Sequence, residues 1–266
     1  NATYSNKLYA YIKGNITNNV TYRPQLNTTT FNGGTQSILG TSTTSFYNLV
    51  ANPVTSLTMG SSSINVDWNL TLSSGQLLCG SYSVNLKGNF TNNADYTDNG
   101  TGVRLIGATQ QNISGSGTFS TLELNNASGA RLLSSITLNK DLKLTQGIFN
   151  INQYKLTLGV NSNITGTSFS ATKMIEVDGA FSNVGILKYF PIYNGADVTF
   201  TYPLGVSSKY TPAVFTYSKN DVVGYIIVRR DADGDAQRHQ AGNFTRVAGD
   251  RLITRLRCGG RIRSVI

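Results

Sequence analysis

Apolar and polar residues alternate along this chain over very short stretches. Leu70-Thr-Leu72, Val84-Asn-Leu86 and Leu122-Glu-Leu124 show the pattern, and Ile136-Thr-Leu138 and Leu156-Thr-Leu158 repeat it. A period of two places alternate side chains on opposite faces of a β-strand, so each stretch predicts a strand with two or three inward-facing residues. Asn-Gly hairpin turns are missing between most of these stretches. We therefore expect the backbone to wind around an axis, with each strand stacked about 4.8 Å from its equivalent in the next coil.

Self-comparison of the chain reveals a long repeat. The segment 13–19 (KGNITNN) returns as 87–93 (KGNFTNN), at an offset of 74. Phe46 and Leu49 return as Phe119 and Leu122 at an offset of 73, and further apolar positions return at 72. A repeat with small insertions indicates a repeat architecture. It divides the region 1–170 into a partial unit, 1–32, and two units, 33–106 and 107–170.

The repeat and the alternation together predict an all-β fold, a right-handed parallel β-solenoid. Each unit of 72–74 residues would hold about three coils of roughly 24 residues. Asparagine pairs at 18–19, 92–93 and 125–126 are placed to form amide ladders at turns. An antiparallel sandwich is the alternative, although its strands are usually longer.

After residue 170 the repeat stops and the predicted strands lengthen. Segments 186–189, 198–202, 213–217 and 224–228 predict a small antiparallel, sandwich-like β module over 171–228. Pro203 and Pro212 would stand at strand ends, where a missing N–H costs least. Such a module would cap the solenoid and protect its open edge.

Residues 229–266 differ in composition from the rest of the chain. They contain nine Arg and no Lys, whereas the first 228 residues contain ten Lys and three Arg. So complete a change indicates that this anomalous Arg-rich tail has a different origin from the domain before it. A basic arm for nucleic acid is the alternative, but no nucleic-acid partner is expected.

Composition narrows the class of protein. Only 13% of residues are charged and 39% are hydrophobic, with a net charge of +9. The abundance of turn and strand formers argues against a helical protein, and the apolar content is sufficient for a core. The longest apolar runs, such as 226–228, are too short for a membrane-spanning helix. Cys79 and Cys258 make no spacing motif, and Cys79 is expected to be a buried thiol.

Few residues could carry chemistry. Asp67 and Asp141 occupy equivalent positions in two units and are expected to serve the architecture, while 95–100 (DYTDNG) predicts an Asx turn in a loop. The only histidine, His239, lies in the tail, so no His-based site is expected in the body. No catalytic or cofactor-binding residue is predicted, and we expect no enzyme. Asp231, Asp233 and Asp235 form a weak calcium candidate that lacks the EF-hand Gly and Glu.

Tyrosines cluster near both ends of the region 1–228. Half are expected to be core or sheet-face residues, and the others could stack against sugars or line a partner surface. The set comprises Tyr4, Tyr9, Tyr11, Tyr22, Tyr189, Tyr193, Tyr202, Tyr210 and Tyr217.

The pattern over 117–126 (GTFSTLELNN), followed by 136–149 and 156–159, resembles the repetitive β-solenoid regions of large surface adhesins. Such proteins occur in Bacteroidota-type bacteria and are often exported by the type IX pathway. The segments 202–206 (YPLGV) and 209–214 (KYTPAV) resemble a stretch that follows these solenoids.

The resemblance implies a secreted, extracellular protein of the cell surface with a structural or adhesive role. Its solenoid would serve as a stalk or a self-associating element, and its partners would be surface glycans or other copies of itself. Two alternatives remain: a carbohydrate-active β-helix enzyme of the lyase or hydrolase kind, and a subunit of an extracellular filament.

Overall fold

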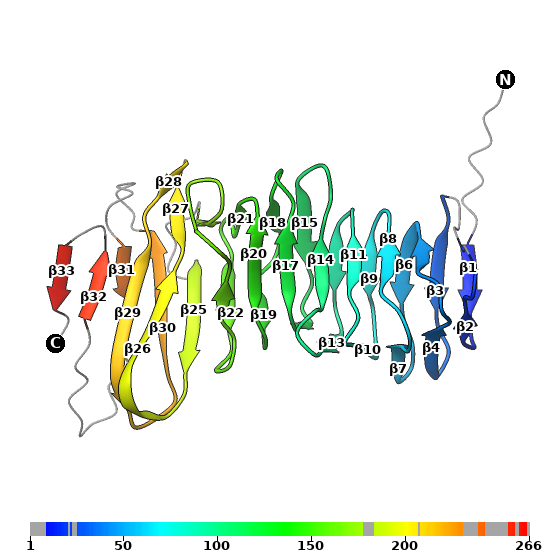
Figure 1. Cartoon of the computed structure of the whole chain (residues 1–266), viewed down its shortest axis with the longest axis horizontal. Coiled ribbons are helices and arrows are strands. Elements are labelled where there is room, and N and C mark those ends of the chain that lie inside the picture. Colours follow the sequence, from blue (N-terminus) through cyan, green and yellow to red (C-terminus); the bar gives the residue numbers. More distant parts are fainter. Residues whose placement is uncertain are drawn as a thin grey trace.

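A computed structural model describes residues 9–20, 22, 26–177, 184–206, 208–230, 239–242, 255–258 and 261–264, with side chains described as far as residue 228. These residues form strands and no helix. The strands stand side by side along the long axis of the molecule (Figure 1). The predicted all-β solenoid is therefore confirmed.

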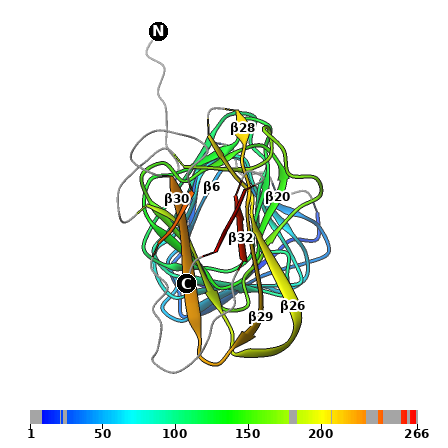
Figure 2. The same cartoon turned by 90° about the vertical axis from the view of Figure 1, so that its left-hand side faces the viewer.

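Successive strands visit three faces in turn and then begin the next coil, so the end-on view shows strands around a common interior (Figure 2). Sheet A contains β1 (Tyr9–Ile12), β3 (Thr28–Phe31), β6 (Asn48–Ala51), β9 (Leu70–Leu72), β12 (Phe90–Asn92), β15 (Gln111–Ser114), β18 (Ala130–Leu132), β21 (Phe149–Asn150), β24 (Ile175–Glu176), β27 (Leu204–Val206) and β28 (Lys209–Tyr210). Sheet B contains β2 (Ile16–Thr17), β4 (Thr35–Leu39), β7 (Ser56–Met59), β10 (Gln76–Gly80) and β13 (Asp95–Asp98). Sheet C contains β5 (Thr44–Phe46), β8 (Ile64–Val66), β11 (Val84–Leu86), β14 (Val103–Leu105), β17 (Leu122–Asn125), β20 (Leu142–Gln146) and β23 (Ile164–Thr165).

Two further sheets complete the described strands. Sheet D contains β16 (Thr118–Phe119), β19 (Ile136–Leu138), β22 (Lys155–Leu158), β25 (Gly185–Phe190), β30 (Gly224–Arg230) and β31 (His239–Gly242). Sheet E contains β26 (Tyr193–Tyr202), β29 (Ala213–Asn220), β32 (Arg255–Cys258) and β33 (Arg261–Ser264). The backbone N–H of Thr118 donates to Asp95 Oδ1 across 3.0 Å, so sheet D continues the face of sheet B.

The strand register gives a shorter coil than the 24 residues predicted. Thr28 pairs with Asn48, and Leu70 pairs with both Leu49 and Phe90, so these coils take 20 or 21 residues. An offset of 74 is not a whole number of such coils. Ile16 lies in sheet B, whereas its repeat equivalent Phe90 lies in sheet A. The sequence repeat therefore relates strands on different faces, because all three faces use the same short strand pattern.

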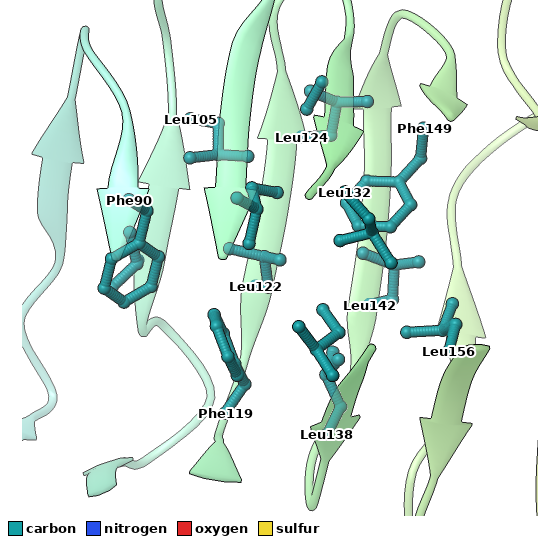
Figure 3. Close-up of a cluster of buried hydrophobic side chains, with 14 of the residues drawn as sticks. Phe90, Leu105, Phe119, Leu122, Leu124, Leu132, Leu138, Leu142, Phe149 and Leu156 are labelled. Carbon is teal, nitrogen blue, oxygen red and sulfur yellow. The ribbon is translucent and has the colours of Figure 1, made fainter. Parts of the chain in front are cut away.

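The core is one continuous apolar cluster inside the coils. Side chains of successive coils point into the shared interior, as Figure 3 shows for Phe90, Leu122 and Leu142 among others. Each short strand follows the predicted alternation: in β9, Leu70 and Leu72 are buried and Thr71 between them is half-buried. Phe90 and Phe119 make an edge-to-face contact, with ring centroids 5.2 Å apart.

Buried amides connect the coils at the corners. Asn18 and Asn92 each donate from Nδ2 to a backbone carbonyl of the next coil, at Thr43 and Thr118 respectively. Their Oδ1 atoms accept from the backbone N–H two residues ahead, which is an Asx turn. The predicted role of these asparagines at turns holds, but their bonds run to backbone groups and, for Asn18, also to the Thr44 hydroxyl, and not from one of these amides to another.

Antiparallel strands follow the solenoid, as predicted. β25 pairs in parallel with β22 on one side and antiparallel with β30 on the other. β26 and β29 form a long antiparallel pair. Sheet A meanwhile continues in parallel register as far as β27, so the parallel and antiparallel parts share strands at their junction.

Candidate functional site

The carboxylates of the solenoid hold neighbouring coils together. Asp67 Oδ1 lies 2.7 Å from Lys87 Nζ, one coil further on. Glu123 accepts from Arg104 Nε at 2.9 Å and from Thr145 Oγ1 at 2.9 Å, in the coils before and after its own. Asp141 Oδ1 accepts from the backbone N–H of Asn163. Asp67 and Asp141, equivalent in the sequence repeat, therefore stand at different corners and each serves a contact between coils.

Asp98 is the most buried of these carboxylates. Its strand, β13, covers part of the segment predicted as a loop, although the predicted Asx turn is present, with Gly100 N–H donating to Asp98 Oδ1 at 2.5 Å. The backbone N–H and the hydroxyl of Thr121 also donate to this carboxylate, each at 2.9 Å. Burial raises the pKa of Asp98, but the hydrogen bonds from Ser120, Thr121 and Gly100 outweigh burial and hold the pKa below its ordinary value.

Two more titratable side chains lie beside Asp98 under the junction of sheets B and D. Tyr96 donates its hydroxyl to Thr121 O at 2.8 Å, and burial raises its pKa well above the ordinary value. Burial, with the charge of Asp98, raises the pKa of the Cys79 thiol to about 12. A protonated thiol is a poor nucleophile, so Cys79 is not activated for chemistry. The hydrogen bond from Tyr96 to Thr121 instead joins β13 to the segment after β16. Cys79 is buried and free, as predicted.

Two lysines bind backbone carbonyls next to Asp98. Lys140 Nζ donates to Asp98 O, and Lys143 Nζ donates to Gly100 O, each reaching across two coils. Lys140 Nζ also lies 4.0 Å from Asp98 Oδ1. Lys140 thus places an ammonium near the buried carboxylate, and the two lysines bind carbonyls at the end of β13 and in the turn after it.

A second buried charge lies where the parallel and antiparallel parts meet. Lys188 on β25 donates to the carbonyls of Gly159 and Val160, both at 2.8 Å. Its Nζ also lies over the rings of Phe190 and Phe200, 5.5 and 5.7 Å from their centroids. Burial lowers the pKa of Lys188 to about 8, against the opposing effect of Asp141.

One pair of stacked aromatic side chains lies at the corner between sheets C and A. Tyr47 and Trp68 occupy this corner in successive coils, and the backbone N–H of Trp68 donates to the backbone carbonyl of Tyr47 at 2.8 Å. Their rings stack with an interplanar angle of 1° and centroids 6.0 Å apart, and Trp68 is 51% exposed. With Asp67, Lys87 and Gly88 these residues form what we call the aromatic corner.

The tyrosines singled out from the sequence divide between surface and core. Tyr9 and Tyr11 are exposed on β1, whereas Tyr202 and Tyr217 are buried. Tyr193 packs its ring against Tyr217 and donates its hydroxyl to Ala196 O. Tyr4 lies outside the described residues. The remaining three, Tyr22, Tyr189 and Tyr210, are each half-buried.

The calcium candidates Asp231, Asp233 and Asp235 lie outside the described residues. Within the described part of the chain, no three His, Cys, Asp or Glu side chains lie close enough together to hold a metal ion. None of the described segments forms a helix of the length and apolarity that crossing a bilayer requires.

Sequence reasoning missed the aromatic corner. A signal was present in the sequence, because 47–49 (YNL), 68–70 (WNL) and 88–90 (GNF) share a form at a spacing of 20 or 21 residues. Comparison at the longer offset of 72–74 does not align these three segments with one another.

Comparison with protein-family models, with curated proteins and with solved structures finds no match to this chain.

Proposed function

We propose that this chain is a structural and adhesive element of a secreted cell-surface protein, with its solenoid acting as a stiff stalk. The observation that carries this proposal is the single apolar core running through successive coils in parallel register. A coil in such a stack cannot bend away from its neighbours without separating strands and opening the core. A polar, weakly charged exterior suits an extracellular role.

The use of the acidic residues supports a non-catalytic role. Glycosidase-type chemistry needs two carboxyl groups facing one substrate bond. Asp67, Asp98 and Glu123 are each engaged instead with groups of a neighbouring coil. Their charges are used to hold the stack together.

Electron microscopy and light scattering of the purified chain test the stalk. We expect short rods of uniform length with the mass of one chain. Rods that lengthen with concentration would contradict the stalk and favour a filament subunit. Cleavage of any member of a polysaccharide panel, monitored by reducing ends and by absorbance of unsaturated products, would contradict the non-catalytic role.

A further inference from the structure

We propose that the aromatic corner is a binding site for a neutral carbohydrate, whose sugar ring stacks on the exposed indole of Trp68. This inference rests on the proposed adhesive function and gives that function a location. Three observations support it. The rings of Tyr47 and Trp68 stack, Gly88 follows in the next coil without a side chain, and Asp67 and Lys87 form an ion pair in the same two coils.

Gly88 keeps the position beyond Trp68 free of a side chain. Its N–H donates to Trp68 O at 2.9 Å, so it follows Trp68 at the same corner, one coil further on. A Cβ atom on Gly88 would lie 2.2 Å from Trp68 O and 2.4 Å from Trp68 C, both backbone atoms. No side chain can therefore occupy this position while the coils keep their spacing. Among the described residues, the only aromatic ring that stacks on Trp68 is that of Tyr47.

The polar neighbours favour a ligand that is uncharged and rich in hydroxyl groups. Asp67 and Lys87 directly precede Trp68 and Gly88 in the same two coils, and both side chains are about half exposed. Together they offer carboxylate oxygens that accept and an ammonium that donates hydrogen bonds. Because their charges offset each other, neither a cationic nor an anionic ligand gains from the pair. A sugar presents C–H groups to an aromatic face and hydroxyls at its rim, which matches this arrangement.

Trp68 is the only tryptophan in the chain, so its fluorescence reports on this site alone. We would titrate the protein with a panel of neutral cello-, xylo-, manno- and chito-oligosaccharides and measure tryptophan emission and its quenching by acrylamide. At least one oligosaccharide should shift the emission and protect it from acrylamide. Binding measured by calorimetry should weaken about tenfold in Trp68→Ala and much less in Trp68→Phe. Tyr11→Ala, at an exposed tyrosine on β1, is the matched control and should bind as the wild type does.

The other outcomes distinguish an error in the position of the carbohydrate site from an error in the proposed adhesive function. Oligosaccharide binding that leaves Trp68 emission unchanged and survives Trp68→Ala would overturn this site while leaving the adhesive function intact. Binding of none of the panel would overturn the inference, while the stalk would still be judged by microscopy. Binding of a charged oligosaccharide in place of the neutral panel, with an affinity that falls steeply with salt, would also overturn it.

Discussion

At the scale of single residues, several buried polar groups of the solenoid have hydrogen-bond partners in a neighbouring coil. Asp98 has Thr121 and Gly100, and Asn92 has the carbonyl of Thr118. A buried polar group without a partner costs far more than the modest net gain of a hydrogen bond. These contacts therefore specify which coil lies against which, beyond what the apolar core requires.

Lys188 makes stability depend on pH. Its pKa is about 8 in the folded chain and 10.5 as the ordinary value. Between these values the unfolded chain binds one more proton at this lysine, so the contribution of Lys188 to the free energy of unfolding should rise with pH, by on the order of 3 kcal/mol. Below pH 8 the lysine is charged in both states and the full cost of burial applies. The measurement is denaturant unfolding from pH 7 to 10.5.

Two substitutions isolate this effect. Lys188→Met should remove its part of the rise, whereas Lys209→Met, at an exposed site, should keep the wild-type slope. The difference between each variant and the wild type cancels groups that titrate in all three proteins, such as Cys79. An unchanged slope in Lys188→Met would contradict the assignment.

At the scale of elements, a ladder of asparagines aligns the strands of sheet A. Asn69 N–H donates to Asn48 Oδ1, Asn89 N–H to Asn69 Oδ1, and Asn112 N–H to Asn89 Oδ1, at 3.2, 2.9 and 2.8 Å. A strand of three residues forms few backbone bonds, so side-chain bonds just before it help to set its register. The ladder runs beside the aromatic corner and holds the turns that carry Trp68 and Gly88.

Removing one member of this ladder should destabilise the stack. Asn89→Ala deletes the acceptor for Asn112 N–H and should lower the free energy of unfolding by about 1–2 kcal/mol. Asn161→Ala, at an exposed asparagine, should change it by less than about 0.5 kcal/mol. Urea unfolding followed by circular dichroism measures both. Equal effects would show that the ladder adds no stability.

At the scale of the whole molecule, the coils form a linear stack in which each contacts chiefly the coils before and after it. Coils in the middle pack on both sides, as β12 does between β9 and β15. Stability in such a stack is close to a sum of terms for single coils and for neighbouring pairs. A coil with two neighbours should therefore open less often than one near an end.

Hydrogen exchange followed by mass spectrometry can measure this gradient. Amides of β9, β12 and β17 should exchange most slowly, and those of β1 and β2 should exchange faster. The two groups of strands have similar lengths, so strand length does not account for the difference. Equal protection of all these strands would indicate that the solenoid opens only as a single cooperative unit.

Much of the fold could be predicted because alternation is a local property. Leu122, Leu124 and Leu138 are buried where the period of two places them inward. The coil length could not be read from the repeat, because strands of all three faces share one pattern and a comparison matches any of them. The aromatic corner could not be predicted from the sequence repeat for a related reason. Trp68 becomes part of a candidate site only together with Tyr47 and Gly88, which lie 20 or 21 residues away in the sequence. Only the strand register brings the three residues to one corner.

The sequence by itself determined that this chain is a β-solenoid with a Leu-, Ile-, Val- and Phe-lined interior, since inward and outward positions depend only on neighbouring residues. The tertiary structure decided which strands stack, where charge is buried and what the surface offers. Asp98 becomes a buried acceptor only when Thr121 lies one coil away, and Trp68 stacks on Tyr47 only because the strand register brings both to one corner. Turn lengths accumulated over a whole coil set these distances, and no local pattern encodes them.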